Sequence, residues 1–436
     1  MIIGGWTRIE IRSLRAALRM SQSEFAFAMG YSVHAVQRWE HLRVGHALRG
    51  KSPADLDAQL ERLDERQLRR FEAELANRYA ALPAGSDGRE FAVDERDDVK
   101  RRQFGKLGAA VGAAWAAPGW GISADAARFG VGDARALMAA IDDLGTREQR
   151  VGGVSLVDEA LVGVAKAQAM LDGCVYDDQA GQEMRTAAGN LACLAGWMAF
   201  DSAAHPLARH CYNEALALAN EADDDDLTAH VCLNSALQIA ALSRSGHARP
   251  QRALVMVSRA RDLMRGRPPG RIHALIAMRE AMAHAVAADS QGFSRAMATA
   301  WRELDHAIDH EPIAECPRWL RFVTPTEALH QESRGLSDLG EFTRSAELST
   351  AAVNEVAGTR NATFYQAWDA VTRVKVGDSD GAIASGKAVL EAMRAKSVES
   401  TRTLKALMPV RNAVREPETE QFALDFDQLS KAVALS

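Results

Sequence analysis

Aromatic residues are scarce in this chain, and runs of β-branched residues that would form strands are nearly absent. Only 6% of the 436 residues are Phe, Trp or Tyr, whereas 47% are hydrophobic and 25% are charged. Such proportions are typical of a globular protein rather than a disordered one. A chain rich in Ala, with few aromatic residues and little strand signal, predicts an all-α fold in which helices pack closely through small residues.

Cysteine is also sparse, and the patterns that metals and cofactors need are missing. The five Cys are scattered, with no Cys-x-x-Cys, and the twelve His show no His-Glu-x-x-His. Neither a zinc site nor a disulfide framework is indicated, and reduced thiols in the cytoplasm are expected. No phosphate-binding loop or dinucleotide fingerprint occurs. We therefore predict no metal, no cofactor and no enzymatic activity.

One segment resembles a twin-arginine export signal. Arg101 and Arg102 precede a short apolar run at 107–117. A bilayer span needs roughly 20 apolar residues, and export signals lie at the N-terminus. Because this run is shorter and internal, we interpret it as a buried or hinge helix and predict no membrane association.

Two further patterns have an ordinary helical interpretation. Gly377 to Gly381 matches Gly-x-Ser-x-Gly, but a nucleophile elbow needs a strand before its Ser379, and a helical pattern precedes it here. The acidic run Asp223 to Asp226 could bind a cation loosely, yet it fits the solvated start of a helix better. Both are predicted to be turns between helices.

The clearest positive pattern spans Thr7 to Glu40. Ser21 and Glu24 form a capping box that predicts a helix from Gln22, Gly30 can end that helix, and Ser32 can cap the next one. The expected apolar positions are Ile11, Leu14, Leu18, Phe25, Ala26, Met29, Val36 and Trp39. This arrangement predicts a helix-turn-helix, whose second helix enters the DNA major groove.

The same segment resembles the DNA-binding domain of the Xre/Cro family. Residues 20–30 are similar to the second helix and its turn, and residues 33–40 to the third helix. The resemblance implies that Gln22 contacts the DNA backbone and that Arg15 forms a structural ion pair with Glu40. The chain departs from the family at His41, where Gly is common, and in residues 42–53. The resemblance assigns the other contacts with bases or phosphates to Ser32, Val33, His34, Gln37 and Arg38.

Charge favours DNA contact by this part of the chain. Residues 1–51 hold eight Lys or Arg and three Asp or Glu, a net charge of +5, whereas the whole chain carries −6 and the remaining 385 residues −11. A basic head on an acidic body suits contact with phosphates by the head alone. A helix-turn-helix-like module used for protein contact remains the alternative.

The chain divides by pattern into three parts. Residues 1–80 are predicted to form the DNA-binding domain, closed by a helix that starts near Ser52 and continues to about Tyr79. Residues 81–132 are predicted to be a linker with a hinge or apolar helix. Residues 133–436 show helical periodicity throughout, with helix pairs from about Thr186 and a last helix near residues 418–433.

These helix pairs resemble tetratricopeptide repeats. Ala208, Tyr212 and Ala215 match the small–aromatic–small register of such repeats, whose usual length is about 34 residues. Similar contexts recur at longer intervals, at Ala253, Ala296, Ala346 and Ala382. Pairs of this kind stack into an α-solenoid with a concave surface, and an irregular helical bundle is the alternative.

The first helix of each pair would line that concave surface. The ligand-binding candidates on these helices are therefore Asn190, Asn234, Gln238 and Arg279. Amides can bond a peptide backbone as both donor and acceptor. For the amides the alternative is exposure to solvent or a link between helices, and for Arg279 it is a surface ion pair.

An Xre-type head joined to tetratricopeptide-like repeats resembles bacterial regulators that sense a peptide or another signal. The resemblance implies a cytoplasmic, homodimeric transcriptional regulator that binds double-stranded DNA and responds to a peptide or small-molecule signal. The Ala-, Arg- and Asp-rich composition is typical of a high-GC bacterium, such as an actinobacterium. The alternative is a tetratricopeptide interaction scaffold with an auxiliary DNA-binding head.

Overall fold

The computed structural model of the chain is helical throughout the part that it describes, and it divides into two compact units, Met1–Gln103 and Phe104–Ser436. Among the described residues there is no strand, only an isolated bridge between Arg128 and Val175. The all-α prediction is therefore confirmed. The structure describes residues 6–29, 36, 39–40, 48, 52–61, 63, 67, 70–71, 74–75, 120, 128–355, 360–395, 398–413 and 420–435.

The first unit contains α1 (Arg8–Ala17), α2 (Gln22–Met29) and α4 (Ser52–Glu61). The Ser21–Glu24 capping box is present, since each residue's backbone N–H donates to the side chain of the other, at 2.8 and 3.2 Å. Thr7 and Glu10 form a second capping box at the start of α1, with the same three-residue spacing. Sequence analysis did not identify this second box.

One hydrophobic core joins the helices of the first unit. It contains the expected apolar residues of α1 and α2, together with Val36 and Trp39. Trp6, which the sequence analysis did not place in the core, is buried against Phe71, and its indole N–H donates to Asp57 at 2.8 Å. Residues on both sides of the predicted turn thus share one core.

The helix predicted to run from Ser52 to about Tyr79 is not continuous. Helix α4 ends at Glu61, Leu63 lies outside a helix, and Phe71 and Leu75 are helical again. Phe71 is buried and contacts the same core as Leu56. The interruption lets both segments face one small core, which a single straight helix of this length would pass by.

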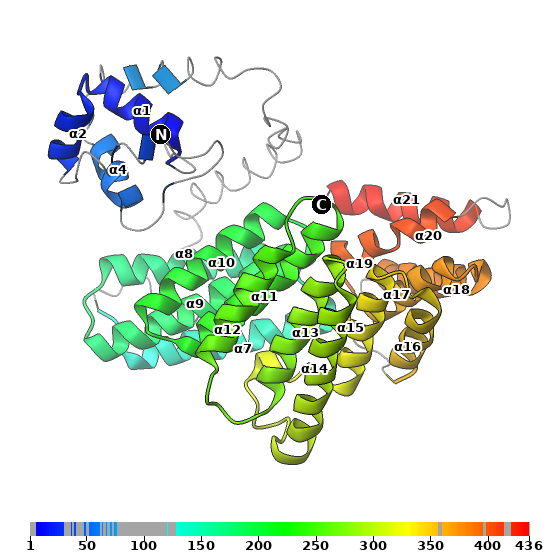
Figure 1. Cartoon of the computed structure of the whole chain (residues 1–436). Coiled ribbons are helices and arrows are strands. Elements are labelled where there is room, and N and C mark those ends of the chain that lie inside the picture. Colours follow the sequence, from blue (N-terminus) through cyan, green and yellow to red (C-terminus); the bar gives the residue numbers. More distant parts are fainter. Residues whose placement is uncertain are drawn as a thin grey trace. The chain divides into compact units, whose positions relative to one another are not determined.

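The second unit is a series of helices followed by three shorter or terminal ones (Figure 1). The helices are α7 (Val131–Val151), α8 (Val157–Gly173), α9 (Asp178–Asp201), α10 (His205–Glu221), α11 (Asp225–Arg244), α12 (Gln251–Leu263), α13 (Arg271–Val286), α14 (Ser290–His310), the 3₁₀ helix η2 (Arg318–Leu320), α15 (Pro325–Asp338), α16 (Phe342–Glu355), α17 (Arg360–Lys375), α18 (Ser379–Arg394), α19 (Thr401–Ala406), α20 (Met408–Ala413) and α21 (Glu420–Leu435).

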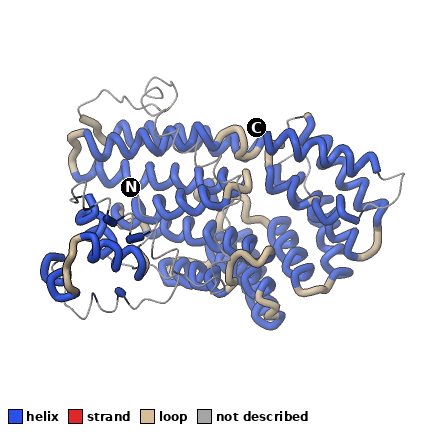
Figure 2. The backbone as a smooth tube through the Cα atoms, turned by 90° about the horizontal axis from the view of Figure 1, so that it is seen from above, coloured by secondary structure: helices blue, strands red, loops and turns tan. Residues whose placement is uncertain are grey.

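Helices α9 to α18 pack as five successive pairs, in which each helix contacts its partner and the next pair in order. The first members α9, α11, α13, α15 and α17 also contact one another in sequence. Figure 2 shows the pairs side by side with short loops between them. Helix α7 contacts both α9 and α17, so it lies against the first and the last pair of the series.

The second helix of each pair buries residues at positions i, i+4 and i+7, which lie on one helix face. The five buried triplets are Ala208, Tyr212 and Ala215 in α10; Ala253, Val257 and Ala260 in α12; Phe293, Met297 and Ala300 in α14; Ser345, Ser349 and Ala352 in α16; and Ala382, Gly386 and Val389 in α18.

Two of the repeat positions predicted from Ala residues fall in another register. In α14 the triplet begins at Phe293 rather than Ala296, because Gly335 of α15 has no Cβ and leaves room for the Phe293 ring. In α16 it begins at Ser345 rather than Ala346. The hydroxyls of Ser345 and Ser333 each donate to the other residue's backbone carbonyl at 2.8 Å, so a hydroxyl replaces the expected small apolar contact.

Gly196 of α9 illustrates the close contact within a pair. A Cβ at this position would lie 2.5 Å from the ring of the buried Tyr212. We expect Gly196→Ala to lower the free energy of unfolding by about 1–3 kcal/mol through overpacking, measured by urea denaturation and far-ultraviolet circular dichroism. Gly132→Ala, where a Cβ meets no atom within 4 Å, is the control. Equal stability of the two variants would contradict the packing argument.

The end of the helical series is bonded to its beginning. Buried Asp201, at the end of α9, accepts hydrogen bonds from the hydroxyl of Ser400 (2.9 Å) and from Nε of Arg402 (3.2 Å). The backbone N–H of Glu399 donates to the carbonyl of Val151 at 2.5 Å. These bonds fix the segment before α19 against α7 and α9.

Of the helices in the described part of the chain, none combines the length and apolar character that crossing a bilayer requires. The apolar run predicted at 107–117 lies outside the described residues.

Candidate functional site

Gln22, the predicted contact with the DNA backbone, lies at the first position of α2. Its amide Nε2 donates to Glu40 at 2.7 Å. Glu40 also receives Nε of Arg15 at 2.5 Å and Nη2 at 3.2 Å, so the predicted Arg15–Glu40 ion pair is confirmed. The structure thus gives Gln22 a bond inside the first unit, and its contact with DNA remains a prediction.

Glu40 is the polar centre of this unit, with 2% of its surface exposed. Burial opposes its charge, but the hydrogen bonds from Arg15 and Gln22 and the charges of Arg15 and Arg12 outweigh burial and place its pKa below the ordinary value. Glu40 therefore stays ionised and links α1, the start of α2 and the helical residues at 39–40. The other predicted DNA contacts, Ser32, Val33, His34, Gln37 and Arg38, lie outside the described residues.

The three amides predicted to face a ligand each donate to a group of the protein itself. Asn190 donates to the Thr186 carbonyl one turn earlier (2.9 Å), Asn234 to the Cys193 sulfur (3.5 Å), and buried Gln238 to the His205 carbonyl (2.9 Å). Asn234 and Gln238 therefore link α11 to neighbouring elements. The bonds of Asn234 and Gln238 therefore agree with the alternative prediction, in which these amides link helices.

Arg279 of α13 is buried, with 3% of its surface exposed, so its interpretation as a surface ion pair is wrong. Its Nε and Nη1 make no hydrogen bond, and no carboxylate of the described residues lies within ion-pair distance. Burial lowers the pKa of Arg279, and the nearby charge of Glu327 opposes that effect. Glu327, Tyr365 and Arg402, on α15, α17 and α19, lie near this guanidinium group.

Further buried polar side chains lie on α15, the first helix of the next pair after α13. Arg334 of α15 is 5% exposed and stacks on Trp368 at 4.4 Å, while its Nε makes no hydrogen bond. His330 stacks on Tyr365 with ring centroids 4.3 Å apart, and neither of its ring nitrogens has a hydrogen-bond partner. Burial lowers the pKa of both Arg334 and His330. The His330 imidazole is therefore neutral at physiological pH.

The carboxylates of this region already have partners. Glu327 accepts from the hydroxyl of Tyr365 (2.5 Å) and from Nε2 of Gln331 (2.6 Å). Asp338 accepts three hydrogen bonds from Arg244, the shortest at 2.7 Å. Arg279 and Arg334 are thus the cations that have no carboxylate partner among the described residues here.

Sequence analysis found only Arg279 of this buried set. His330 and Arg334 lie on α15, Tyr365 on α17 and Arg402 on α19, and each has the spacing of an ordinary helical polar residue. The only available signal was that several first helices of pairs carry a polar residue in an otherwise apolar stripe. That pattern does not show on which of these first helices the polar residue is buried by other side chains.

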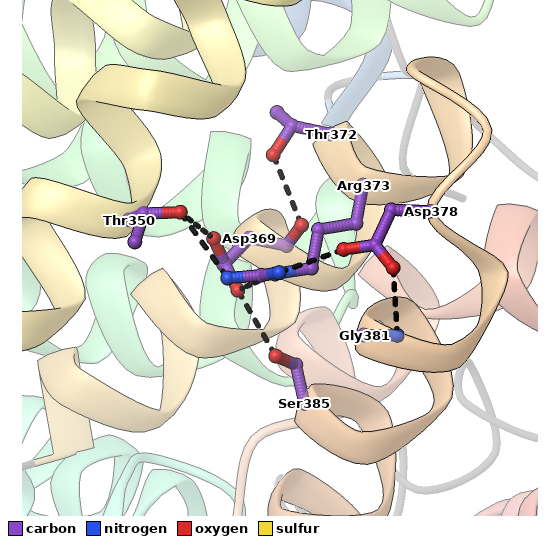
Figure 3. Close-up of polar contacts among 7 residues, drawn as sticks. All are labelled: Thr350, Asp369, Thr372, Arg373, Asp378, Gly381 and Ser385. Carbon is purple, nitrogen blue, oxygen red and sulfur yellow. Dashed lines mark hydrogen bonds and ion pairs between the residues drawn. The ribbon is translucent and has the colours of Figure 1, made fainter.

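Gly377 and Asp378 of the Gly-x-Ser-x-Gly match form the predicted turn between α17 and α18, whereas Ser379 to Gly381 already belong to α18. Helix α17, not a strand, precedes it, and Asp378 caps α18 by accepting from Gly381 N–H at 3.0 Å. Figure 3 shows Arg373 between Asp378 and the buried Asp369, at 2.8 and 2.6 Å. Thr350 and Ser385 also donate to Asp369, so this polar cluster ties α16, α17 and α18 together.

The acidic run at 223–226 is a helix start, as predicted. Asp224 caps α11 by accepting from Leu227 N–H at 2.9 Å, and Asp226 pairs with Arg267 at 2.9 Å. Across the described part of the chain, no group of three or more His, Cys, Asp or Glu side chains is placed to hold a metal ion.

No family model, curated protein or solved structure matches this chain.

Proposed function

We propose that this protein is a sequence-specific, DNA-binding transcriptional regulator whose second unit binds a signal. The observation that carries the proposal is the capped pair α1–α2, fixed by Arg15 and Gln22 to Glu40 within residues 1–51, which carry a net charge of +5. A rigid support of this kind holds a following helix at a defined angle, which reading DNA in the major groove requires.

The helix pairs of the second unit support a tetratricopeptide-like solenoid. Five pairs with buried i, i+4, i+7 triplets follow one another, and each contacts its neighbours in order. Stacked pairs of this type commonly serve for binding and self-association. We infer a cytoplasmic homodimer with two recognition helices about one DNA turn, roughly 34 Å, apart.

Signal binding would change the affinity for DNA by favouring one arrangement of the repeats. A ligand shifts such an equilibrium only through its different affinities for the two states. Titration of a candidate signal against the protein on operator DNA measures this coupling. Operator affinity that stays constant at saturating signal would remove the sensing part of the proposal.

Arg38 and His34 provide the direct test of DNA binding. After genome-wide mapping of bound DNA identifies a site, we expect Arg38→Ala to weaken binding by about 1–3 kcal/mol if Arg38 contacts a base. If it contacts phosphate, the loss will be similar on all sequences. Fluorescence anisotropy on specific and random duplexes distinguishes the two results.

The control is Arg265→Ala, which removes the same charge at an exposed position of the second unit. It should leave DNA affinity unchanged. Full affinity of the Arg38→Ala, His34→Ala double variant would reject the assignment. It would favour the alternative, an interaction scaffold whose head is auxiliary.

A further inference from the structure

Two guanidinium groups lie buried without an anion in the second unit. Arg279 and Arg334 are 3% and 5% exposed, and each has nitrogen atoms with no hydrogen-bond partner. Within the described residues no carboxylate pairs with either of them. An unpaired buried charge is costly and uncommon in proteins, so its presence needs a specific explanation.

The carboxylates near the two arginines bind other partners. The charges of Glu327 and Arg402 act on both guanidinium groups. The nearby carboxylates are engaged elsewhere: Glu327 by Tyr365 and Gln331, Asp338 by Arg244, and Asp201 by Ser400 and Arg402. Neither Arg279 nor Arg334 is therefore neutralised by a directly bonded carboxylate among the described residues.

Flat ring surfaces adjoin these charges. Arg334 lies over Trp368, and Arg402 lies 4.0 Å from the centre of the Phe364 ring. His330 stacks on Tyr365, and its two nitrogens are unpaired. The planar guanidinium fork matches a carboxylate or phosphate with two parallel hydrogen bonds. Aromatic rings favour a flat apolar group beside that anion.

We propose that the region between α13, α15 and α17 binds a small organic anion in which a carboxylate or phosphate adjoins a flat ring. Arg279 and Arg334 bind the acidic group, and the rings of Phe364, Tyr365 and Trp368 hold the rest. This assignment deepens the proposed signal-binding role and rests on it for its regulatory meaning. Because both arginines are covered, binding favours an arrangement in which the surrounding helices open.

The test uses the full-length protein without DNA, so that its outcome is independent of operator binding. Thermal unfolding is followed with benzoate, phenyl phosphate, inorganic phosphate or sodium chloride at one ionic strength. We expect benzoate or phenyl phosphate to raise Tm by about 2–4 °C at tenfold its dissociation constant. A rise in Tm with benzoate alone assigns a carboxylate ligand, and a rise with phenyl phosphate alone assigns a phosphate ligand.

The variants Arg279→Met and Arg334→Met distinguish a ligand-binding role of these arginines from a purely structural role. Replacing a buried unpaired charge by an apolar side chain of similar size should keep or raise Tm without ligand. The same variants should lose the rise produced by the probe, whereas Arg302→Met, at an exposed position, keeps it.

Three results would overturn the inference. The first is that no probe stabilises the wild type. The second is that all anions, including chloride, act equally on wild type and variants. The third is that both Met variants unfold at clearly lower temperatures or fail to fold, which would assign the arginines a structural role. Loss of DNA binding in a separate assay affects none of these readouts.

Discussion

Asp201→Ala should lower the free energy of unfolding of the second unit by about 3–5 kcal/mol, because it removes one partner of a buried ion pair. Asp201 is fully buried at the end of α9 and accepts bonds from Ser400, Arg402 and the Gly153 N–H. The substitution leaves the Arg402 cation without this carboxylate and detaches the segment before α19. Urea denaturation measures the loss, and hydrogen exchange at α19 should become faster.

The control for this variant is Asp427→Ala. Asp427 binds Arg411 through two short hydrogen bonds, at 3.0 and 2.7 Å, but both partners are exposed. Exposed pairs contribute little even when their geometry is good, so its unfolding transition should hardly move. If both variants lose the same stability, the contacts of Asp201 with Ser400 and Arg402 do not close the helical series.

Glu40→Ala should lower the free energy of unfolding of the first unit by about 3 kcal/mol. This value is near the lower end of the range for removing one partner of a buried ion pair, because Arg15 keeps contact with water. The substitution removes the acceptor for Arg15 and Gln22 and therefore releases α1 from α2. Hydrogen exchange of peptides from residues 6–29 measures the loss within this unit alone. DNA affinity should fall with it, since the supporting helices no longer hold their positions.

Glu24→Gln is the matched control, since Glu24 is exposed and only closes the capping box of α2. It should change hydrogen exchange only in the first turn of that helix.

The pH dependence of stability gives a second check on Glu40. The folded pKa of Glu40 is lowered, so its contribution is full above the unfolded value of about 4.3 and disappears as the pH falls through the folded pKa. Exchange of residues 6–29 that is indifferent to Glu40→Ala would contradict this role.

Local features of the fold were predictable from the sequence. The Ser21–Glu24 capping box and the core positions of α1 and α2 depend on residues three or four apart, so their pattern is visible in the chain itself. The end of the helix at Glu61 was not predicted, because the apolar spacing continues across the break from Leu60 to Phe71. Nothing local to that segment marks the end of α4.

The candidate ligand region was predicted only in part. Arg279 was identified by its place on the first helix of a pair, but its burial depends on helices distant in sequence. The use of Gln238 as a link to the His205 carbonyl depends on the preceding helix pair, because His205 begins α10. Likewise, the register of α16 follows from Ser333 and Ser345 bonding across two helices. Such features are set by tertiary contacts, to which a single sequence gives no direct access.

The bond between Asp201 and Ser400 spans 199 residues, and this separation has a consequence for the order of folding. Contacts between distant residues form late, because the intervening chain must first be ordered. During synthesis the early helix pairs are complete well before Ser400 emerges, since chains fold from the N-terminal side as they are made. Until then, the buried carboxylate of Asp201 stays open to water. A nascent chain that stops before residue 400 therefore exposes the Asp201 carboxylate, which the complete protein buries.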